Sequence, residues 1–411
     1  MTKAIHDNTD TQLALLGGRP AITEEPPPWP YFDQSDRDAL DEVLESRVWG
    51  GYHPKVGELE VHFAAFHGAE FGVALANGTV SLEIALQAVG VGPGDEVIVP
   101  PVTFVASATS ILRVGAVPVF ADLDPQTLNL HPERVAEAVT ERTRAVVAVH
   151  FAGHPVDLDA LTDICARGGL KLIEDCAHAH GAEWRGRRVG GFGQFGSFSF
   201  QASKNMTAGE GGILVTNDAE LAERARSISN QGRRTGGEWY EHVRLGTNAR
   251  LTGFQAALLL KQLGRLPQEV ETRMARAARL REGLAEVGGL VPTPETLDPR
   301  VTAHGYHLFP MRYDEGAFGG LSRDRFVEAL KAEGVPASTG YPYPLYRNEL
   351  FKEHRHVVKP CPVAEEVCGS WVWLPHNVLL AGEGWIDGVL AAVRKIRDGA
   401  GALLAATKPA V

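Results

Sequence analysis

Between residues 55 and 220 the sequence alternates short apolar runs, rich in β-branched residues, with amphipathic segments of helical periodicity. The runs that predict strands are 72–76, 96–99, 117–121, 145–149 and 171–174, and the segments that predict helices are 55–67, 80–89, 106–113, 132–139 and 158–167. Buried strands that alternate with helices pair in parallel through right-handed crossovers. The rhythm therefore predicts an open α/β sheet, whose ligands bind beyond the carboxyl ends of the strands.

The regions outside this rhythm predict a division into two domains. The further elements that we expect are a helix at 35–44 with Ser35 as its cap, two close strands at 196–200 and 212–216, a long helix at 254–287, a strand at 307–313 and a helix at 323–334. The long helix resembles a bridge between a large and a small domain. We therefore predict an extended N-terminal arm over 1–30, a large domain over 31–265 and a smaller C-terminal α/β domain over 266–411.

Composition and charge narrow the classes of partner. The chain is 44% hydrophobic and 22% charged, which is typical of a globular domain, and its net charge of −11 disfavours nucleic acid and anionic membranes. No apolar run approaches the roughly 20 residues that a membrane-spanning helix needs. Four cysteines without a paired CxxC spacing form neither a disulfide framework nor a zinc motif. We expect a reduced, cytoplasmic protein that binds no metal.

Two motifs suggest chemistry that their context does not favour. Gly191, Gly193 and Gly196 spell the GxGxxG dinucleotide fingerprint, but the fingerprint must follow a strand and open a helix, and here it precedes a strand-like run. His178 and His180 form an HxH pair, which without further ligands is a weak metal signal. Neither motif predicts a nucleotide or a metal site.

Gly78 and Thr79 stand between a predicted strand and a predicted helix. A helix N-terminus offers free backbone N–H groups and the positive end of the helix dipole, which together bind phosphate. Gly78 allows close approach of the backbone, and the Thr79 hydroxyl adds a donor. The alternative is an ordinary helix cap, and the two interpretations stay open on these residues alone.

Asp175 directly follows the predicted strand at 171–174 and so lies at the ligand-binding edge of the sheet. A structural aspartate there would cap a turn. An ionised aspartate placed against a pyridine nitrogen instead keeps that ring protonated, so that the ring accepts electrons from a developing carbanion.

Lys204 lies between the aromatic strand 196–200 and a glycine-rich turn that leads into another buried strand. Most lysines are solvated surface charges, but a partly desolvated lysine has a lowered pKa and keeps the free amine that Schiff-base formation needs. Ser199, five residues earlier, is placed to reach the same phosphate as Thr79.

Together these segments resemble the DegT/DnrJ/EryC1/StrS family of aminotransferases, over roughly residues 28–398. The resemblance implies a fold-type-I transferase that depends on pyridoxal 5′-phosphate (PLP), with pyridoxamine 5′-phosphate as the intermediate form. It implies that Lys204 carries PLP as a Schiff base and acts as the catalytic residue. It also implies that Asp175 pairs with the pyridine nitrogen.

The resemblance extends to other cofactor contacts. It implies that Gly78, Thr79 and Ser199 hold the phosphate and that Phe104 stacks on the cofactor ring. His178 occupies a position that is often glutamine in the family and that contacts the ring face or its 3-oxygen. A histidine there resembles the cyclitol and aminohydroxybenzoate branch more than the nucleotide-sugar branch.

Two later segments are similar to regions of the family that bind partner and substrate. Asn248 lies in a segment that implies a homodimer, in which this residue reaches the partner's cofactor phosphate. Arg250 is a candidate for shaping that shared site, with a surface ion pair as the alternative. Ala249 departs from the aromatic residue usual in the family. Tyr341 and Tyr343 lie where the sugar branch has a histidine-tyrosine-proline motif, and they are candidates for lining the substrate pocket or for a Pro-rich turn.

The implied reaction transfers an amino group from L-glutamine or L-glutamate to a polyhydroxylated ring ketone, such as scyllo-inosose, in the biosynthesis of an aminoglycoside-type metabolite. A nucleotide-linked keto-sugar aminotransferase and an aromatising 3-amino-5-hydroxybenzoate synthase are the alternatives, and both retain the lysine. Lys204 argues against the related keto-sugar dehydratases, which have histidine at that position. A PLP-binding regulatory domain is the non-enzymatic alternative.

Overall fold

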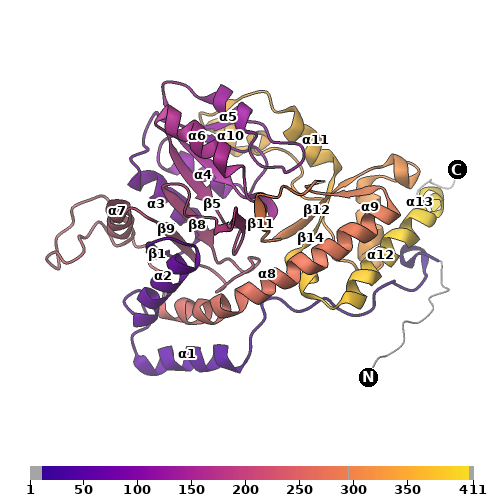
Figure 1. Cartoon of the computed structure of the whole chain (residues 1–411), viewed down its shortest axis with the longest axis horizontal. Helices are drawn as coiled ribbons and strands as arrows, with labels where there is room; N and C mark the ends of the chain where they lie inside the picture. Colours follow the sequence, from indigo (N-terminus) through magenta and orange to yellow (C-terminus); the bar gives the residue numbers. More distant parts are fainter. Residues whose placement is uncertain (1–11, 295, 407–411) are drawn as a thin grey trace.

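The computed structural model describes residues 12–294 and 296–406, which form a large domain, a long helix and a smaller domain (Figure 1). An eight-stranded sheet lies at the centre of the large domain, in the order β1-β9-β8-β5-β4-β2-β3-β13. Its strands are Phe71–Leu75 (β1), Glu96–Val99 (β2), Val117–Phe120 (β3), Thr143–Val149 (β4), Lys171–Asp175 (β5), Phe195–Ser199 (β8), Gly212–Thr216 (β9) and Val357–Val358 (β13). Every strand predicted for this sheet is present, with ends shifted by at most two residues.

The sheet is mostly parallel, as the sequence predicts. All neighbours from β8 to β13 pair in parallel. Strand β9 is the exception, because it runs antiparallel to both β8 and β1. The short connection between Ser199 and Gly212 contains no helix that could cross over the sheet, so the chain turns back on itself.

Alternate residues of the central strands face two different cores. In β2, Val97 and Val99 pack in the core that contains α3, α4 and α7, whereas Ile98 packs in the core that contains α2, α5, α6 and α8. Both faces of the sheet are therefore covered by helices, which explains why its strands are continuous apolar runs. The helices are Pro54–Phe66 (α2), Gly78–Ala88 (α3), Ala106–Arg113 (α4), Pro132–Ala138 (α5), Leu158–Gly168 (α6), Ala219–Ser229 (α7) and Gly253–Val287 (α8).

Helix α8 carries one apolar stripe from the large domain into the small one. Leu263 and Leu266 belong to the core under the large sheet, whereas Leu280 and Leu284 belong to the core of the small domain. The helix continues through Pro267. The predicted boundary between 265 and 266 falls inside this helix, and it stays a prediction.

The small domain contains a three-stranded antiparallel sheet and three helices. These elements are Leu290–Pro292 (β10), Leu308–Tyr313 (β12), Trp371–Pro375 (β14), Arg323–Ala332 (α9), Glu383–Asp398 (α12) and Ala400–Ala406 (α13). The strand predicted at 307–313 and the helix predicted at 323–334 are β12 and α9. Strand β13 lies outside this domain although it falls in the predicted range 266–411, because it pairs with β3 at the edge of the large sheet.

The described part of the predicted N-terminal arm packs against the small domain. Leu13 and Ile22 are buried in that domain's core, and the Ile22 N–H donates to the Glu333 carbonyl (3.0 Å). Residues 1–11 of the arm lie outside the described residues. The described part of the arm contains one 3-10 helix, Ala14–Leu16, and is held against the small domain.

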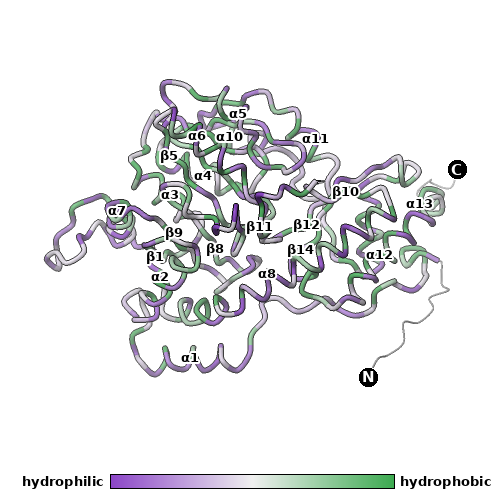
Figure 2. Tube along the Cα trace, in the orientation of Figure 1, coloured by the Kyte–Doolittle hydropathy of each residue, from purple (hydrophilic) through white to green (hydrophobic). Residues whose placement is uncertain are grey.

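Helix α1 (Gln34–Ser46) follows the arm and packs on α8 through Ala39 and Val43. Hydrophilic and hydrophobic residues alternate along it in Figure 2, as expected for a helix with one buried face. Its cap is Asp33 and not the predicted Ser35, because the Asp33 carboxylate accepts the Ser35 N–H (2.8 Å). Within the described ranges, no helix has both the length and the apolar character that a bilayer crossing requires.

The glycines that resemble a dinucleotide fingerprint serve close packing. Glu174 is fully buried, and its carboxylate accepts the N–H groups of Gly190 (2.8 Å), Phe192 (2.8 Å) and Gly193 (2.9 Å). A Cβ atom at Gly196 would lie 2.3 Å from Cα of Gly190. The turn can therefore wrap around Glu174 only because Gly190 and Gly196 lack side chains.

We predict that Gly196→Ala lowers the free energy of unfolding by about 1–3 kcal/mol, because the methyl group forces the turn away from β8. Chemical denaturation measures this change. Gly92→Ala is the matched control, since a Cβ atom at Gly92 meets no atom within 4 Å. Equal stabilities of the two variants would contradict the packing role.

Candidate active site

A cavity of about 680 Å³ opens at the carboxyl ends of β4, β5 and β8 and at the N-terminus of α3. This is the edge at which the α/β sheet predicts a ligand, and the volume is typical of a small-molecule site. Seven residues predicted from the sequence line it together: Gly78, Thr79, Phe104, Asp175, His178, Ser199 and Lys204. The fold therefore brings to one place residues that are up to 126 positions apart.

One end of the cavity is a cradle at the start of α3. Asn77 caps the helix, and its side chain accepts the Val80 N–H (2.9 Å). The first N–H groups of a helix have no acceptor within the helix, so those of Gly78 and Thr79 are available to a ligand. A Cβ atom at Gly78 would lie 2.7 Å from Cβ of Ser199, so glycine is needed for the Ser199 hydroxyl to reach this end. The arrangement suits a phosphate group.

Asp175 lies at the other end of the cavity as a buried carboxylate with two donors. The Ser107 hydroxyl donates to Oδ2 (2.8 Å) and the Ala177 N–H donates to Oδ1 (3.2 Å). Burial raises the pKa of Asp175, and the two hydrogen bonds and the charge of Lys204 oppose that rise. A carboxylate in this setting is stabilised by a cationic partner such as a protonated pyridine nitrogen.

Lys204 presents its amine to the same cavity. Burial lowers the pKa of Lys204 from 10.5 to about 8, while the negative charge of Asp175 acts in the opposite direction. About a tenth of the amine is therefore unprotonated at pH 7, whereas an ordinary surface lysine is almost fully protonated there. An unprotonated amine is the form that attacks a carbonyl group.

His178 is a neutral imidazole with a fixed proton. The Ala152 N–H donates to Nδ1 (3.3 Å), which places the ring proton on Nε2. Burial holds the pKa of His178 well below its ordinary value. The ring stacks on His307 (4.3 Å between centroids), and His307 Nδ1 in turn bonds the Asn205 side chain (3.0 Å). His178 therefore offers a fixed N–H donor to a ligand.

The structure separates the two members of the HxH pair. His178 lines the cavity, whereas His180 packs against Phe198 (5.5 Å) on the aromatic strand. A second group, His150, Glu174 and Cys176, has its possible ligand atoms within 4.8 Å of one another. Glu174 already accepts several N–H groups, and His150 Nδ1 accepts the Val156 N–H (3.0 Å) and so donates from Nε2 to Glu174. Its hydrogen bonds account for this cluster without an ion.

Phe104 turns an exposed aromatic face to the cavity, with 57% of its surface accessible.

The remaining predicted site residues are not among those that line the cavity of the single chain. Asn248 is exposed, and Arg250 donates to the Asn230 side chain (2.8 Å). Tyr341 packs edge-on against Trp373. Burial raises the pKa of Tyr341, and the nearby charge of Asp175 raises it further. Tyr343 is 42% exposed.

Several contributors were not predicted from the sequence. Ser107 positions Asp175, and His307 and Asn205 support His178. Trp29 reaches the cavity region from the N-terminal arm, because its indole N–H donates to the Lys204 carbonyl (3.1 Å). None of these residues belongs to a local sequence motif. Only Asn205 could have been suggested by the sequence, because it directly follows the predicted catalytic residue Lys204.

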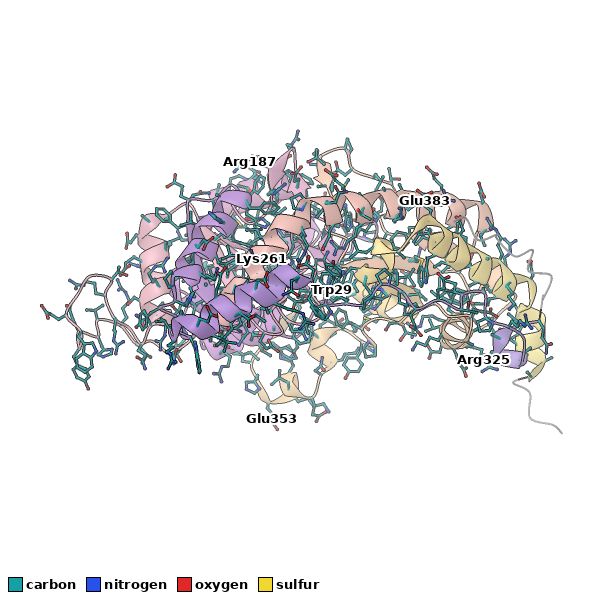
Figure 3. The ribbon with its side chains drawn as sticks, turned by 90° about the horizontal axis from the view of Figure 1, so that it is seen from below. Trp29, Arg187, Lys261, Arg325, Glu353 and Glu383 are labelled. Atoms are coloured by element: carbon teal, nitrogen blue, oxygen red, sulfur yellow. The ribbon has the colours of Figure 1, made fainter. Side chains whose placement is uncertain are left out.

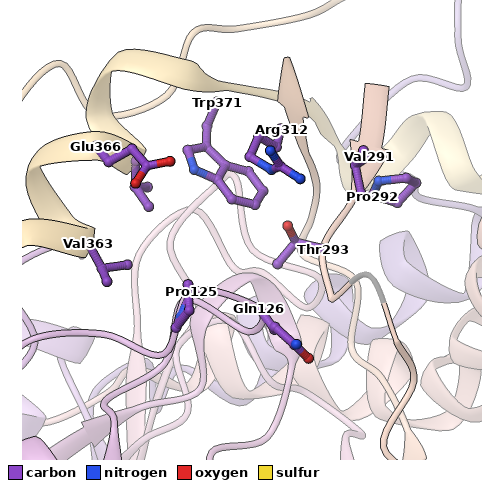
Figure 4. A pocket seen from close by; sticks show the side chains of 10 residues that line it. Pro125, Gln126, Val291, Pro292, Thr293, Arg312, Val363, Glu366 and Trp371 are labelled. Atoms are coloured by element: carbon purple, nitrogen blue, oxygen red, sulfur yellow. The ribbon is translucent and has the colours of Figure 1, made fainter. Parts of the chain in front are cut away.

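A second hollow, of about 220 Å³, lies between the two domains and is distinct from this site (Figure 4). The indole of Trp371 forms its wall, with Arg312 and Glu366 beside it and Pro125 and Gln126 opposite. None of the residues that line it is a lysine, and the N–H of Val363, at the start of the helix Pro362–Ser370 (α11), already donates to Asp122 (3.0 Å). The chemistry predicted from the sequence is therefore concentrated in the larger cavity.

Comparison with known proteins assigns the chain. Residues 30–394 match the DegT/DnrJ/EryC1/StrS aminotransferase family. The chain belongs to this family. It is therefore an aminotransferase, and the enzymes of this family depend on PLP, which is the cofactor inferred from the sequence.

Relatives with named activities are similar over almost the whole chain. A Micromonospora echinospora protein, provisionally named L-glutamine:3-amino-2,3-dideoxy-scyllo-inosose aminotransferase, is 42% identical and covers 95% of this chain and 98% of its own. The L-glutamine:2-deoxy-scyllo-inosose aminotransferase of the same organism is 40% identical (94% and 98%). The crystal structure of 3-amino-5-hydroxybenzoic acid synthase superposes with a TM-score of 0.83 at 40% identity (92% and 99%).

We predict that Asp175→Asn lowers the pKa of the Lys204 amine below about 8 in the protein without PLP. The substitution removes the negative charge that raises this pKa and leaves the desolvation that lowers it. The pH dependence of Lys204 acylation, followed by peptide mass spectrometry, measures the change. Glu366→Gln removes an exposed carboxylate away from the cavity and serves as the control. A higher pKa in Asp175→Asn would contradict the proposed electrostatic pairing.

Proposed function

We propose that this enzyme transfers an amino group from L-glutamine or L-glutamate to a polyhydroxylated ring ketone of the scyllo-inosose type, as a step in aminoglycoside-type biosynthesis. The observation that carries the proposal is the buried amine of Lys204 in one cavity with Asp175 and the cradle at α3. The choice of acceptor is supported by the two inosose aminotransferases described above, which are similar over nearly their whole length.

The residues of the cavity fit PLP. The N–H groups of Gly78 and Thr79 and the Ser199 hydroxyl would hold the phosphate, Asp175 would hold the pyridine nitrogen, and Phe104 would cover the ring. Lys204 would attach the cofactor covalently. When bound, PLP supplies an electron-withdrawing ring that stabilises negative charge at the carbon next to the transferred nitrogen.

The chain's own groups then have distinct tasks. The Lys204 amine would accept the proton from the α-carbon of the donor and then donate it to a carbon of the cofactor, which its pKa of about 8 allows near neutral pH. Asp175 keeps its negative charge beside a cationic partner. His178 donates a fixed hydrogen bond from Nε2, which orients an oxygen atom in the cavity. Tyr341 is a candidate for binding hydroxyl groups of the acceptor, and Tyr343 and Arg250 are further candidates.

Two other acceptors follow from the same site. A nucleotide-linked sugar requires room for a diphosphate and a base outside the cavity. An aromatising activity like that of 3-amino-5-hydroxybenzoate synthase is favoured by the structural similarity to that enzyme.

We also infer a cytoplasmic location, because all four cysteines are free and buried.

We predict turnover of scyllo-inosose or a deoxy-inosose with L-glutamine, and none with a nucleotide-linked keto-sugar. Coupled detection of the amino product across a panel of both acceptor classes and simple keto acids tests this. Lys204→Ala is the control, and it should abolish both turnover and covalent attachment of PLP, detected as a borohydride-reduced adduct. Turnover restricted to nucleotide-linked sugars would overturn the acceptor assignment.

We further propose that the enzyme is a homodimer with shared active sites. Large apolar side chains are exposed on residues 31–52 and on residues 231–245, which project from the body beside α7 (Figure 1). They include Tyr31, Phe32, Trp49, Tyr52, Trp239, Tyr240 and Leu245. Exposed aromatic surface of this extent is typical of an interface. Asn248 is exposed at the base of the projecting segment, from where it would reach a partner's cradle.

We predict that Lys204→Ala and Asn248→Ala subunits complement each other. Each variant alone should be inactive or strongly impaired, whereas a 1:1 mixture that is unfolded and refolded together should recover about a quarter of the wild-type activity, because half of the dimers then hold one intact site. Mixing without refolding is the control. No recovery would show that Asn248 acts within its own chain.

A further inference from the structure

The backbone of Lys204 is held on both sides by hydrogen bonds. Its N–H donates to the Gln201 carbonyl (2.9 Å), which closes a local turn. Its carbonyl accepts the indole N–H of Trp29 (3.1 Å), from a segment 175 residues earlier in the chain. The bond from Trp29 joins the backbone of the lysine to the N-terminal arm, which has no part in the proposed chemistry. This bond therefore calls for a separate explanation.

The indole of Trp29 is held from the small domain by His376, in the 3-10 helix His376–Leu380. Arg273 Nη2 lies 3.4 Å from His376 Nδ1, and because arginine only donates, Nδ1 is the acceptor and Nε2 carries the proton. Trp29 packs edge-on against this imidazole at 4.6 Å.

Residues 24–29 connect Trp29 to the small domain, and we call them the strap. The Trp385 indole N–H donates to the Glu24 carbonyl (3.2 Å), and the Asn377 side chain donates to the Pro27 carbonyl (3.0 Å). In Figure 3 Trp29 lies in the middle of the molecule, where α1 approaches the ribbon of the C-terminal region. The strap is therefore anchored at two points on the small domain and ends on the lysine.

We propose that Trp29 is a positioning residue for Lys204, which together with His376 couples the small domain to the direction of the lysine side chain. The proposal rests on the proposed role of Lys204 in holding PLP. A side chain that must attach a cofactor and later move a proton needs a fixed Cα position, since small displacements of a reacting group reduce rates strongly. The packed indole also shields the lysine segment from water, which preserves the desolvation of its amine.

The test compares two substitutions that remove the same kind of bond from the same strap. Trp29→Phe deletes the indole donor to Lys204 and keeps an aromatic ring. Trp385→Phe deletes the indole donor to Glu24 and leaves Lys204 untouched, so it is the matched control. Both are measured first without PLP, by hydrogen exchange of the peptide that contains Lys204 and by the pH dependence of its acylation. Both are then measured with PLP, as kcat and KM.

For Trp29→Phe we expect faster exchange around Lys204, an amine pKa moved from about 8 toward 10.5, and kcat reduced about tenfold with little change in KM. For Trp385→Phe we expect values close to wild type.

Equal effects of the two variants would show that Trp29 only anchors the strap and would overturn the proposal. A wild-type rate of hydrogen exchange around Lys204 in Trp29→Phe would also overturn it. If that variant does not fold, His376→Ala removes the imidazole against which Trp29 packs and must show the same changes. Hydrogen exchange and acylation are measured without PLP, so they test the positioning role of Trp29 independently of the cofactor role of Lys204, which Lys204→Ala tests.

Discussion

The site depends on keeping a carboxylate and an amine together in a cavity that solvates neither well. Burial raises the pKa of Asp175 and lowers the pKa of Lys204, so each group alone is driven toward its neutral form. Each also stabilises the charge of the other. Such a pair is useful only if its members cannot turn away toward water, and therefore the surrounding hydrogen bonds fix backbone positions as much as side chains. Ser107 and Ala177 do this for Asp175, and Gln201 and Trp29 do it for Lys204.

Strand β5 ends in two carboxylates with opposite tasks. Because side chains alternate along a strand, Asp175 faces the cavity and Glu174 faces the other side of the sheet. Glu174 accepts N–H groups from the turn at 190–193 and the imidazole of His150, which satisfies a buried charge and holds that turn against the sheet. The glycines of this turn explain why a dinucleotide-like pattern occurs in a chain that uses another cofactor. One residue shapes the edge of the sheet and its neighbour carries the chemistry.

The elements that could be predicted from the sequence are those whose signals are local. The helix and strand rhythm of the sheet, the helix start at Gly78 and the segment around Lys204 each depend on neighbours within about one turn or strand. Strand β13, with two residues, has no such signal and is defined only by its pairing with Val119 and Phe120. Trp29, His307 and His376 act on residues about 100 or more positions away, so their roles follow from tertiary packing alone. The sequence could not identify the cap of α1 either, because aspartate and serine are both preferred as N-caps and only the hydrogen bond of Asp33 distinguishes it from Ser35.

The net charge of this enzyme repels a phosphate group, whereas the partial charges at the N-terminus of α3 attract one. A net charge of −11 repels a phosphate-bearing cofactor at long range, so its binding must come from short-range terms that salt screens little. The N-terminus of α3 provides such a term, because its N–H groups act inside a cavity of low dielectric where their partial charges count most. A covalent bond to Lys204 provides the other. The backbone of Lys204 is in turn held by the arm, which is anchored on the small domain. In the proposed role of Trp29, elements outside the sheet therefore contribute to cofactor binding, although the phosphate contacts themselves lie at the edge of the sheet.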